Sequence, residues 1–294
     1  MAKPALYIFG EVLFDHFPDG SAVLGGAPFN VAWHLQAFGQ QPLFISRVGD
    51  DGTGKQVKQA MQEWGMNMAG LQTDSVHPTG KVQVDISDGE PGYLIVPEQA
   101  YDFIADETLQ ALPAAGLLYH GSLALRNPVS RQAWERLKAG CTGLVFLDVN
   151  LREPWWRKAE VLALAGEADW IKLNHVELAA LQADNAPVET AMRRFIDDYR
   201  LQGLVVTRGK QGALAMDAGG HQAEVVPAQS MPVVDTVGAG DAFAAVLLLG
   251  LQLHWPLSLS LQRAQSFASA LVGRRGATVH DPAFYRDFVT EWEI

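Results

Sequence analysis

The chain has 294 residues, of which 48% are hydrophobic, and this size and composition suit a globular protein with a large core. Its 22 Lys and Arg against 33 Asp and Glu residues give a net charge of −11, so we expect no nucleic-acid partner. The apolar runs are too short to span a membrane, and one cysteine, Cys141, cannot form an internal disulfide. We therefore expect a cytoplasmic protein with no membrane partner.

Short apolar runs alternate with segments of helical periodicity along most of the chain. The predicted strands are Ala5–Gly10, Pro42–Val48, Leu117–Gly121, Leu144–Asn150, Asp169–Asn174 and Leu204–Thr207. The predicted helices are Asn30–Phe38, Gly54–Trp64, Val129–Ala139, Pro187–Arg200, Gly240–Leu251, Pro256–Val272 and Pro282–Trp292. Because strands and helices alternate, we predict an α/β fold of three layers, α/β/α, with a mainly parallel central sheet.

One section departs from this alternation. Polar and apolar residues alternate from Lys81 to Ile86, Asp88-Gly89 gives a turn signal, and Tyr93–Val96 is apolar again. This pattern predicts a β-hairpin. Two strands alone are barely stable in water, so we expect the hairpin to join another short sheet or a second subunit. We interpret it as part of a small β-sheet lid.

The segment Gly49–Lys55 fits the first part of a phosphate-binding P-loop, G-x-x-x-x-G-K. The next residue is Gln56, where a Ser or Thr hydroxyl is needed to bind magnesium. We therefore favour an ordinary polar loop between a strand and a helix.

The segment Gly238-Ala239-Gly240-Asp241 opens a predicted helix. Its glycines allow consecutive amides to form an anion-binding nest, and the helix N-terminus adds partial positive charge there. Asp241 could accept a proton from a hydroxyl that attacks a phosphate, or it could only complement the helix dipole. A dinucleotide-binding turn is disfavoured because Phe243 stands where the third glycine is required.

A further glycine pair, Gly25-Gly26, precedes Asn30 at the start of another predicted helix. Paired glycines let a ligand approach the backbone, and Asn30 offers both a donor and an acceptor. A tight turn with Asn30 as its cap explains this segment equally well when it is considered alone.

Considered together, Gly25-Gly26-x-x-x-Asn30-x-Ala32 and Asp235-Thr236-x-Gly238-Ala239-Gly240-Asp241 resemble the paired signatures of the ribokinase-like (PfkB) carbohydrate kinases. The resemblance covers nearly the whole chain. Gly10–Asp15 resembles the first strand of the family with its terminal aspartate, and Asn174-x-x-Glu177 and Thr207-x-Gly209-x-x-Gly212 resemble two further elements. The resemblance implies one ribokinase-like domain over 1–294, with a lid formed by about 12–24 and 78–103.

The resemblance also implies ATP-dependent phosphoryl transfer to a sugar hydroxyl, with Asp241 as the base and the amides of Gly238, Ala239 and Gly240 as the nest. The implied sugar-binding residues are Asp15, Gly25, Gly26, Asn30 and Arg152. The implied nucleotide-binding residues are Asn174, Thr207, Gly209, Gly212, Gly238 and Gly240. Glu177 is expected to hold Mg²⁺ through water, and Asp235 to help bind a monovalent cation such as K⁺. A homodimer formed through the lid is expected.

Several stretches, including Gly25–Asn30 and Asp148–Arg152, resemble bacterial fructokinases more than ribokinases. Fructose, phosphorylated on its 6-hydroxyl, is therefore the expected substrate, with 2-keto-3-deoxygluconate and ribose as alternatives. A catalytically silent sugar sensor on the same scaffold is the alternative of another class. The intact Asp241 and Gly-Ala-Gly nest speak against such a sensor.

Overall fold

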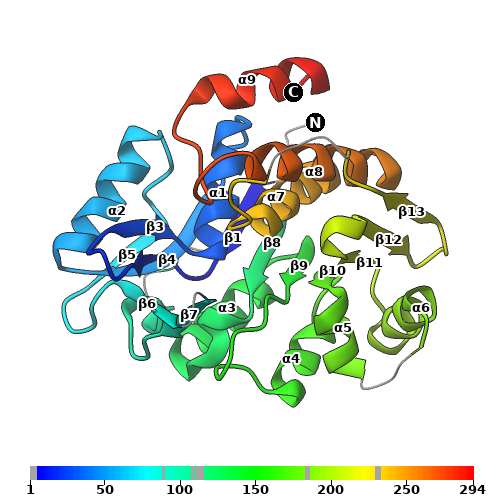
Figure 1. The fold of residues 1–294 in the computed structure, drawn as a ribbon. Helices are drawn as coiled ribbons and strands as arrows, with labels where there is room; N and C mark the ends of the chain where they lie inside the picture. The colour runs from blue at the N-terminus through cyan, green and yellow to red at the C-terminus, as the bar shows by residue number, and fades with distance from the viewer. Residues whose placement is uncertain (1–4, 88–89, 107–108, 110–115, 183–185, 229–232) are drawn as a thin grey trace.

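The computed structural model describes residues 5–87, 90–106, 109, 116–182, 186–228 and 233–294 (Figure 1). The predicted turn at Asp88-Gly89 lies outside the described residues. Through the middle runs a sheet in the order β13-β12-β11-β10-β9-β8-β1-β4-β5. Its strands are β1 (Ala5–Phe9), β4 (Leu43–Gly49), β5 (Leu71–Asp74), β8 (Gly116–Gly121), β9 (Leu144–Asp148), β10 (Trp170–Asn174), β11 (Gly203–Thr207), β12 (Ala213–Asp217) and β13 (Gln222–Val225). The pairs from β5 to β11 are parallel, and β12 and β13 are antiparallel.

Helices cover both faces of this sheet, as Figure 1 shows. One face carries α1 (Ala27–Ala37), α2 (Gly52–Glu63), α7 (Ala239–Gln252), α8 (Leu257–Val272) and α9 (Pro282–Trp292). The other carries α3 (Pro128–Gly140), α4 (Lys158–Ala165), α5 (His175–Gln182) and α6 (Val188–Tyr199). The predicted three-layer α/β/α fold with a mainly parallel sheet is confirmed.

The alternation of side chains along each strand explains the two buried faces. In β1, Leu6 and Ile8 belong to the core beneath α1 and α7, whereas Tyr7 and Phe9 belong to the core above α3. Successive strand residues point to opposite faces, so a strand buried on both sides must be apolar throughout. This requirement is the reason that the central strands could be recognised as continuous apolar runs.

A second, smaller sheet lies beside the body in the order β3-β2-β6-β7. Its strands are β2 (Leu13–His16), β3 (Ala22–Gly25), β6 (Gly80–Ser87) and β7 (Glu90–Ile95). The predicted hairpin supplies β6 and β7, and β6 pairs in parallel with β2. Leu13, Val82 and Ile95 pack with buried residues that include Tyr101 and Leu123, which seats the sheet on the body.

The structure differs from the sequence-based expectation in two respects. The first strand ends at Phe9, and Asp15 lies in β2 of the small sheet rather than at the end of the first strand. Gly10, with φ 151°, separates the two strands, and a side chain there would overlap Pro28. The strands β5, β12 and β13 and the helices α4 and α5 were not predicted. β5 and β13 are partly exposed, which weakens their apolar signal, whereas β12 is buried at 213–216 and its apolar run was not recognised as a strand.

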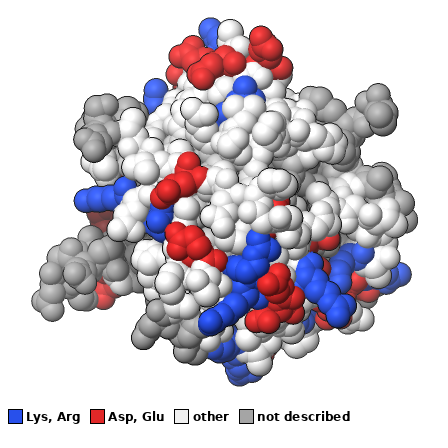
Figure 2. All heavy atoms as spheres, turned by 90° about the vertical axis from the view of Figure 1, so that its right-hand side faces the viewer, with Lys and Arg blue, Asp and Glu red and all other residues white. Residues whose placement is uncertain are grey.

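The surface facing the right-hand side of Figure 1 carries both kinds of charge, and Figure 2 shows acidic and basic side chains next to one another. The elements on this side contribute ion pairs such as Arg193–Asp197, at 3.8 Å, and Arg208–Glu224, at 2.6 Å. In the described part of the chain, no helix combines the length and the hydropathy that a membrane span requires.

Candidate active site

A cleft of about 440 Å³ opens at the carboxyl ends of the parallel strands, between the large and small sheets. Ligands of open α/β sheets bind at this edge. Ten of the predicted site residues line it: Asp15, Gly26, Asn30, Arg152, Asn174, Glu177, Thr207, Gly238, Gly240 and Asp241. The lining does not include Gly25, Ala239, Gly209, Gly212 or Asp235. Five polar lining residues were missed by the sequence prediction: Glu11, Asp148, Asn150, Lys172 and Thr236.

Asp241 and Asn30 meet in the cleft although 211 positions separate them. The Asn30 Nδ2 atom donates to Asp241 Oδ2 at 2.8 Å, which joins the first turn of α7 to α1. Burial raises the pKa of Asp241 to about 6, and the hydrogen bond from Asn30 opposes that rise. A carboxyl group with a pKa of about 6 can exchange its proton near neutral pH, as a general base must.

Asp15 faces Asn30 across Gly25. A Cβ atom added to Gly25 would lie 3.8 Å from Asp15 Oδ2 and 4.0 Å from Asn30 Oδ1, so the missing side chain leaves the space between them open. The Asn30 Oδ1 atom is buried and has no hydrogen-bond partner among the residues that the structure describes. Burial also raises the pKa of Asp15 to about 6. Two acceptors thus border a space that could receive hydroxyl donors.

Gly238 is the N-cap of α7 and has φ 77°, a left-handed conformation that glycine adopts without strain. A side chain at Gly238 would overlap Ala277 in the loop between α8 and α9. The Ala239 N–H donates to the Thr236 carbonyl at 3.3 Å. Gly238 and Gly240 both line the cleft at the positive end of the helix, where an anion is stabilised.

Lys172 and Asp148 form a buried ion pair beneath this helix end. The Lys172 Nζ atom lies 2.8 and 2.9 Å from the two carboxylate oxygens of Asp148, and the Tyr119 hydroxyl donates to Asp148 at 3.2 Å. Nearby, burial raises the pKa of Glu11 to about 7, and in the described part of the chain its Oε2 atom has no hydrogen-bond partner. A charged residue inside an apolar strand was the available sequence signal for Lys172.

Glu177 is held in place by backbone donors. Its two carboxylate oxygens accept hydrogen bonds from the N–H groups of Leu151 and Asn174, each at 2.8 Å. Burial raises its pKa. Asn174 in turn caps α5, because its Oδ1 accepts from the N–H of Glu177 at 2.9 Å. Glu177 is therefore oriented rigidly at the cleft wall, and its oxygens retain lone pairs that can face a water molecule.

Among the described residues, no group of three or more His, Cys, Asp or Glu side chains is arranged to hold a metal ion. Magnesium commonly keeps several waters and is held by one or two carboxylates together with substrate phosphates. Glu177 at the cleft wall fits that kind of site, in which water lies between the carboxylate and the ion.

Asp235 lies at the junction predicted for a monovalent cation. Its Oδ1 accepts from the Val237 N–H at 3.0 Å, and its Oδ2 accepts from the Gly276 N–H at 2.9 Å. The carboxylate therefore ties the nest segment to the loop between α8 and α9. The cation itself stays a prediction.

The predicted nucleotide turn follows β11. Thr207 lines the cleft, and Gly209 and Gly212 have φ values of 56° and 83° in the tight turn behind it. The Arg208 N–H donates to the Gly212 carbonyl at 2.7 Å, which closes the turn. A side chain at Gly212 would overlap Val225 of β13, so this glycine has a packing role.

The P-loop-like segment has a structural role away from the cleft. Asp51 caps α2 by accepting from the Gly54 N–H at 2.6 Å, and it also accepts from the Thr79 N–H at 2.8 Å. Lys55 is exposed and does not line the cleft. The favoured interpretation as a polar loop agrees with these contacts.

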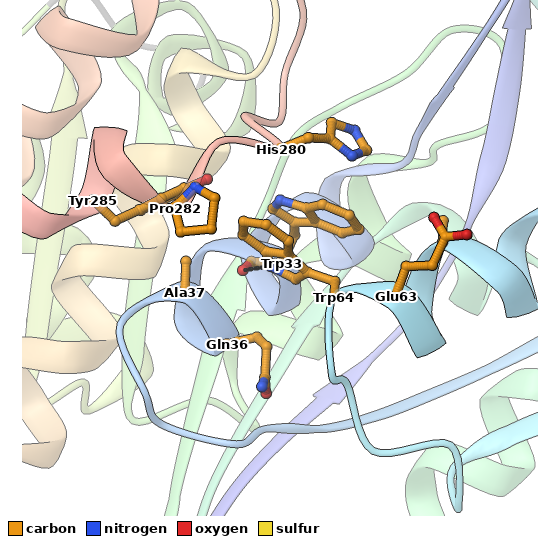
Figure 3. Close-up of a pocket in the computed structure, with 9 residues that line it drawn as sticks. Trp33, Gln36, Ala37, Glu63, Trp64, His280, Pro282 and Tyr285 are labelled. Carbon is orange, nitrogen blue, oxygen red and sulfur yellow. Dashed lines mark hydrogen bonds between the residues drawn. The ribbon is translucent and has the colours of Figure 1, made fainter.

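A separate pocket of about 500 Å³ lies between α1, α2 and the start of α9 (Figure 3). Aromatic rings form part of its wall: those of Trp33 and Trp64 are stacked with centroids 4.6 Å apart, and His280 lies against Trp33. The indole of Trp64 donates to the Trp33 carbonyl at 3.1 Å. The catalytic candidates lie in the cleft and not in this pocket.

The comparisons with known proteins agree with this geometry. A family model described as pfkB family carbohydrate kinase matches residues 8–283. A fructokinase of Klebsiella pneumoniae is 33% identical and aligns with 96% of this chain and 97% of its own length. A fructokinase of Salmonella typhimurium is 30% identical, with 84% of each chain covered. A crystal structure of Vibrio cholerae O395 fructokinase in fructose, ADP and calcium ion bound form is 27% identical, with TM-score 0.83 over 97% of this chain and 98% of that one.

These matches cover nearly the whole chain, and they confirm both the predicted ribokinase-like fold and the predicted family. This chain belongs to the pfkB family of carbohydrate kinases.

Proposed function

We propose that this carbohydrate kinase transfers the γ-phosphoryl group of ATP to the 6-hydroxyl of fructose. The observation that carries the proposal is the Asn30–Asp241 hydrogen bond at the head of α7, which places a raised-pKa carboxyl between the open space beside Asp15 and the glycine nest. The fructokinases among the relatives, and the fructose and ADP bound to the Vibrio cholerae structure, support fructose as the acceptor.

The sugar would occupy the space between Asp15 and Asn30. The Asp15 carboxylate can accept hydrogen bonds from two neighbouring hydroxyls, and the unpartnered Asn30 Oδ1 can accept a third. The glycines at 25 and 26 leave room for the ring, and Arg152 can donate from the cleft wall. Val82, Tyr93 and Ile95 of the small sheet cover this space, so we infer that the sheet acts as a lid that keeps water from competing with the sugar.

The reaction then needs a base and charge stabilisation. Asp241 accepts the proton of the 6-hydroxyl while that oxygen bonds to the γ-phosphorus and the bond from phosphorus to the β,γ-bridging oxygen breaks. The nest amides of Gly238 and Gly240, with the positive end of α7, stabilise the negative charge on the transferring group, whereas the Ala239 N–H is used by the Thr236 carbonyl. Asn174, Thr207, Gly209 and Gly212 would shape the nucleotide side of the cleft.

Magnesium bound with ATP supplies charge neutralisation on the phosphates, and Glu177 would hold the ion through water. Asp235 would contribute to a monovalent cation site such as one for K⁺, the ion bound in a second Vibrio cholerae fructokinase structure. The exposed side chains of Val23 and Leu94 on the small sheet support a homodimer formed through the lid. We expect the enzyme to act in the cytoplasm.

A coupled ADP-release assay over ketoses, aldoses, sugar acids and nucleosides tests the proposal. We expect fructose to give the highest kcat/KM. Arg152 is a cation that could pair with a sugar acid, so 2-keto-3-deoxygluconate is the competitor to include, together with ribose. If only 2-keto-3-deoxygluconate caused ADP release, that sugar acid and not fructose would be the substrate. Sugar binding without ADP release from any member of the panel would instead indicate a silent sensor.

A further inference from the structure

Lys172 is a buried cation to which the proposed reaction has so far given no role. It lies in β10 between Ile171 and Leu173, which belong to the core on the α3–α6 face. Its own side chain therefore points to the opposite face, toward α7. The residue is only 7% exposed, yet it lines the cleft. Burial of an ammonium group is unfavourable, so its position calls for a compensating anion.

The ammonium lies beside the first turn of α7. A Cβ atom added to Gly240 would be 3.5 Å from Lys172 Nζ. The N-terminus of a helix carries partial positive charge, so it repels a cation placed there and favours an anion. Negative charge therefore stabilises this arrangement, and Asp241 in the same helix turn already provides some of it.

Asp148 supplies part of that negative charge. Its two oxygens accept hydrogen bonds from Lys172 at 2.8 and 2.9 Å, and an ammonium group has three N–H donors. Among the residues that the structure describes, Asp148 is the only hydrogen-bond partner of the ammonium. Burial acts to lower the pKa of Lys172, but the pairing with Asp148 raises it above its ordinary 10.5, so the group stays charged.

We propose that Lys172 is a catalytic residue whose ammonium donates a hydrogen bond to the γ-phosphoryl group, beside the nest amides of Gly238 and Gly240. This inference rests on the proposed phosphoryl transfer at Asp241. While the new bond forms to the sugar oxygen and the bond to ADP breaks, the sugar proton goes to Asp241 and Lys172 keeps its own protons. Asp148 fixes the ammonium in advance, so its charge stabilises the transferring group without reorganisation.

The variant Lys172→Met keeps an unbranched side chain, one atom shorter than that of lysine, and removes the charge. We expect kcat with fructose to fall by about 10²–10³-fold, the range for loss of one donor to the transition state. Calorimetric titration should also show that β,γ-imido-ATP loses its affinity advantage over ADP, because ADP lacks the γ-phosphate. Lys55→Met, which removes an exposed lysine outside the cleft, is the matched control and should leave both quantities unchanged.

Removal of Lys172 alone leaves Asp148 as an unpaired buried charge, which could unfold the variant. The double variant Asp148→Asn/Lys172→Met removes both charges and keeps the proposal testable. It should recover the thermal unfolding temperature while kcat and the preference for the ATP analogue stay low. Recovery of kcat and of the preference for the ATP analogue would show that Lys172 only neutralises Asp148, and would overturn its assignment as a catalytic residue. A wild-type chain that binds neither nucleotide would refute phosphoryl transfer itself and the role of Lys172 with it.

Discussion

Asp241 has a raised pKa, which suits a general base but makes its charged form unfavourable in the folded protein. It is a carboxylate close to other acidic groups, and burial raises its pKa from 3.8 to about 6. Asp148 raises that pKa further, whereas the hydrogen bond from Asn30 and the charge of Lys172 lower it. A base poised near neutral pH is useful for proton transfer, but its charged form is disfavoured in the folded chain.

The replacement Asp241→Asn tests both the role of Asp241 as a base and the cost of its charged form to the stability of the fold. The amide can still accept from Asn30 but cannot take a proton, so kcat should fall by about 10²–10⁴-fold while fructose binding is kept. Because the folded pKa is raised, the wild type loses stability as pH rises from about 4 to about 6, and the variant does not. The variant should therefore melt at a higher temperature at pH 7.5, by about 2–4 °C for each 1 kcal/mol relieved.

Differential scanning fluorimetry at pH 4.5 and pH 7.5 measures this difference, which should shrink at the lower pH. Unchanged turnover in the variant would refute Asp241 as the base. Equal melting temperatures of variant and wild type at pH 7.5 would show that the charged form of Asp241 is not disfavoured in the folded chain.

Sequence reasoning located this residue but not its surroundings. Asp241, Asn30 and Asp15 stand in short motifs whose spacing is local, so they could be selected from the sequence. Lys172 and Glu11 enter the cleft through the pairing of β10 and through the segment that follows β1. These placements depend on contacts between distant parts of the chain. A charged residue inside an apolar strand marks Lys172 as unusual, but no local pattern specifies the site that it enters.

At the scale of elements, the loop of residues 273–281 between α8 and α9 supports the nest from behind. The Trp33 indole donates to the Val279 carbonyl at 3.1 Å, and His34 Nε2 lies 3.1 Å from the Ala277 carbonyl. Burial lowers the pKa of His34 to about 3, so its ring is neutral. Nε2 must then carry the proton to donate to Ala277, and Nδ1 can accept from the Tyr285 hydroxyl at 3.0 Å. Helix α1 thus fixes this loop.

The substitution Gly238→Ala tests this rigidity. The new side chain would require φ 77° and would overlap Ala277, whose carbonyl is held by His34. We expect a loss of about 1–3 kcal/mol in the free energy of unfolding, together with weaker ATP binding. Gly276→Ala is the matched control: φ is 88°, but no atom lies within 4 Å of the added Cβ, so only the backbone strain of about 1–2 kcal/mol applies.

Urea denaturation of both variants and of Gly238→Ala/Ala277→Gly separates the two costs. The double variant should recover only the part of the overlap that comes from the Ala277 Cβ atom, because the added methyl group would still lie 2.5 Å from the Ala277 Cα atom. Equal losses in Gly238→Ala and Gly276→Ala would mean that the loop yields to the added methyl group, and that α1 does not hold it firmly.

Burial on both faces made most central strands recognisable in the sequence, but it did not suffice for β12, which is buried at 213–216 and was not predicted. Central strands such as β1, β8 and β11 are apolar on both faces and were recognised, although their boundaries shift by one or more residues. β12 and β13 extend the sheet as an antiparallel pair beyond β11, and their order follows from tertiary packing. In the small sheet, β2 pairs with β6, which lies more than sixty residues later in the chain. The alternation of polar and apolar residues alone could not predict this pairing.

At the scale of the whole molecule, the cleft is built from two halves with different partners. Residues of the small sheet and the start of α1 border the proposed sugar space, whereas β10, β11 and the head of α7 border the proposed nucleotide space. Asp241 lies where the two halves meet. Each ligand should therefore stabilise mainly its own half, since a ligand suppresses the local openings that expose its binding residues.

Amide hydrogen exchange can follow the two halves separately. With fructose, exchange should slow in β6 and β7, because Val82, Tyr93 and Ile95 cover the sugar space. With β,γ-imido-ATP, exchange should slow at 207–212 and in the first turn of α7 instead. A sugar that yields no ADP is the control and should protect neither half. If fructose protected the turn after β11 and left β6 and β7 unchanged, the small sheet would not be a lid. The sugar would then lie on the other side of Asp241, where its hydroxyl could not lie between that carboxylate and the γ-phosphate.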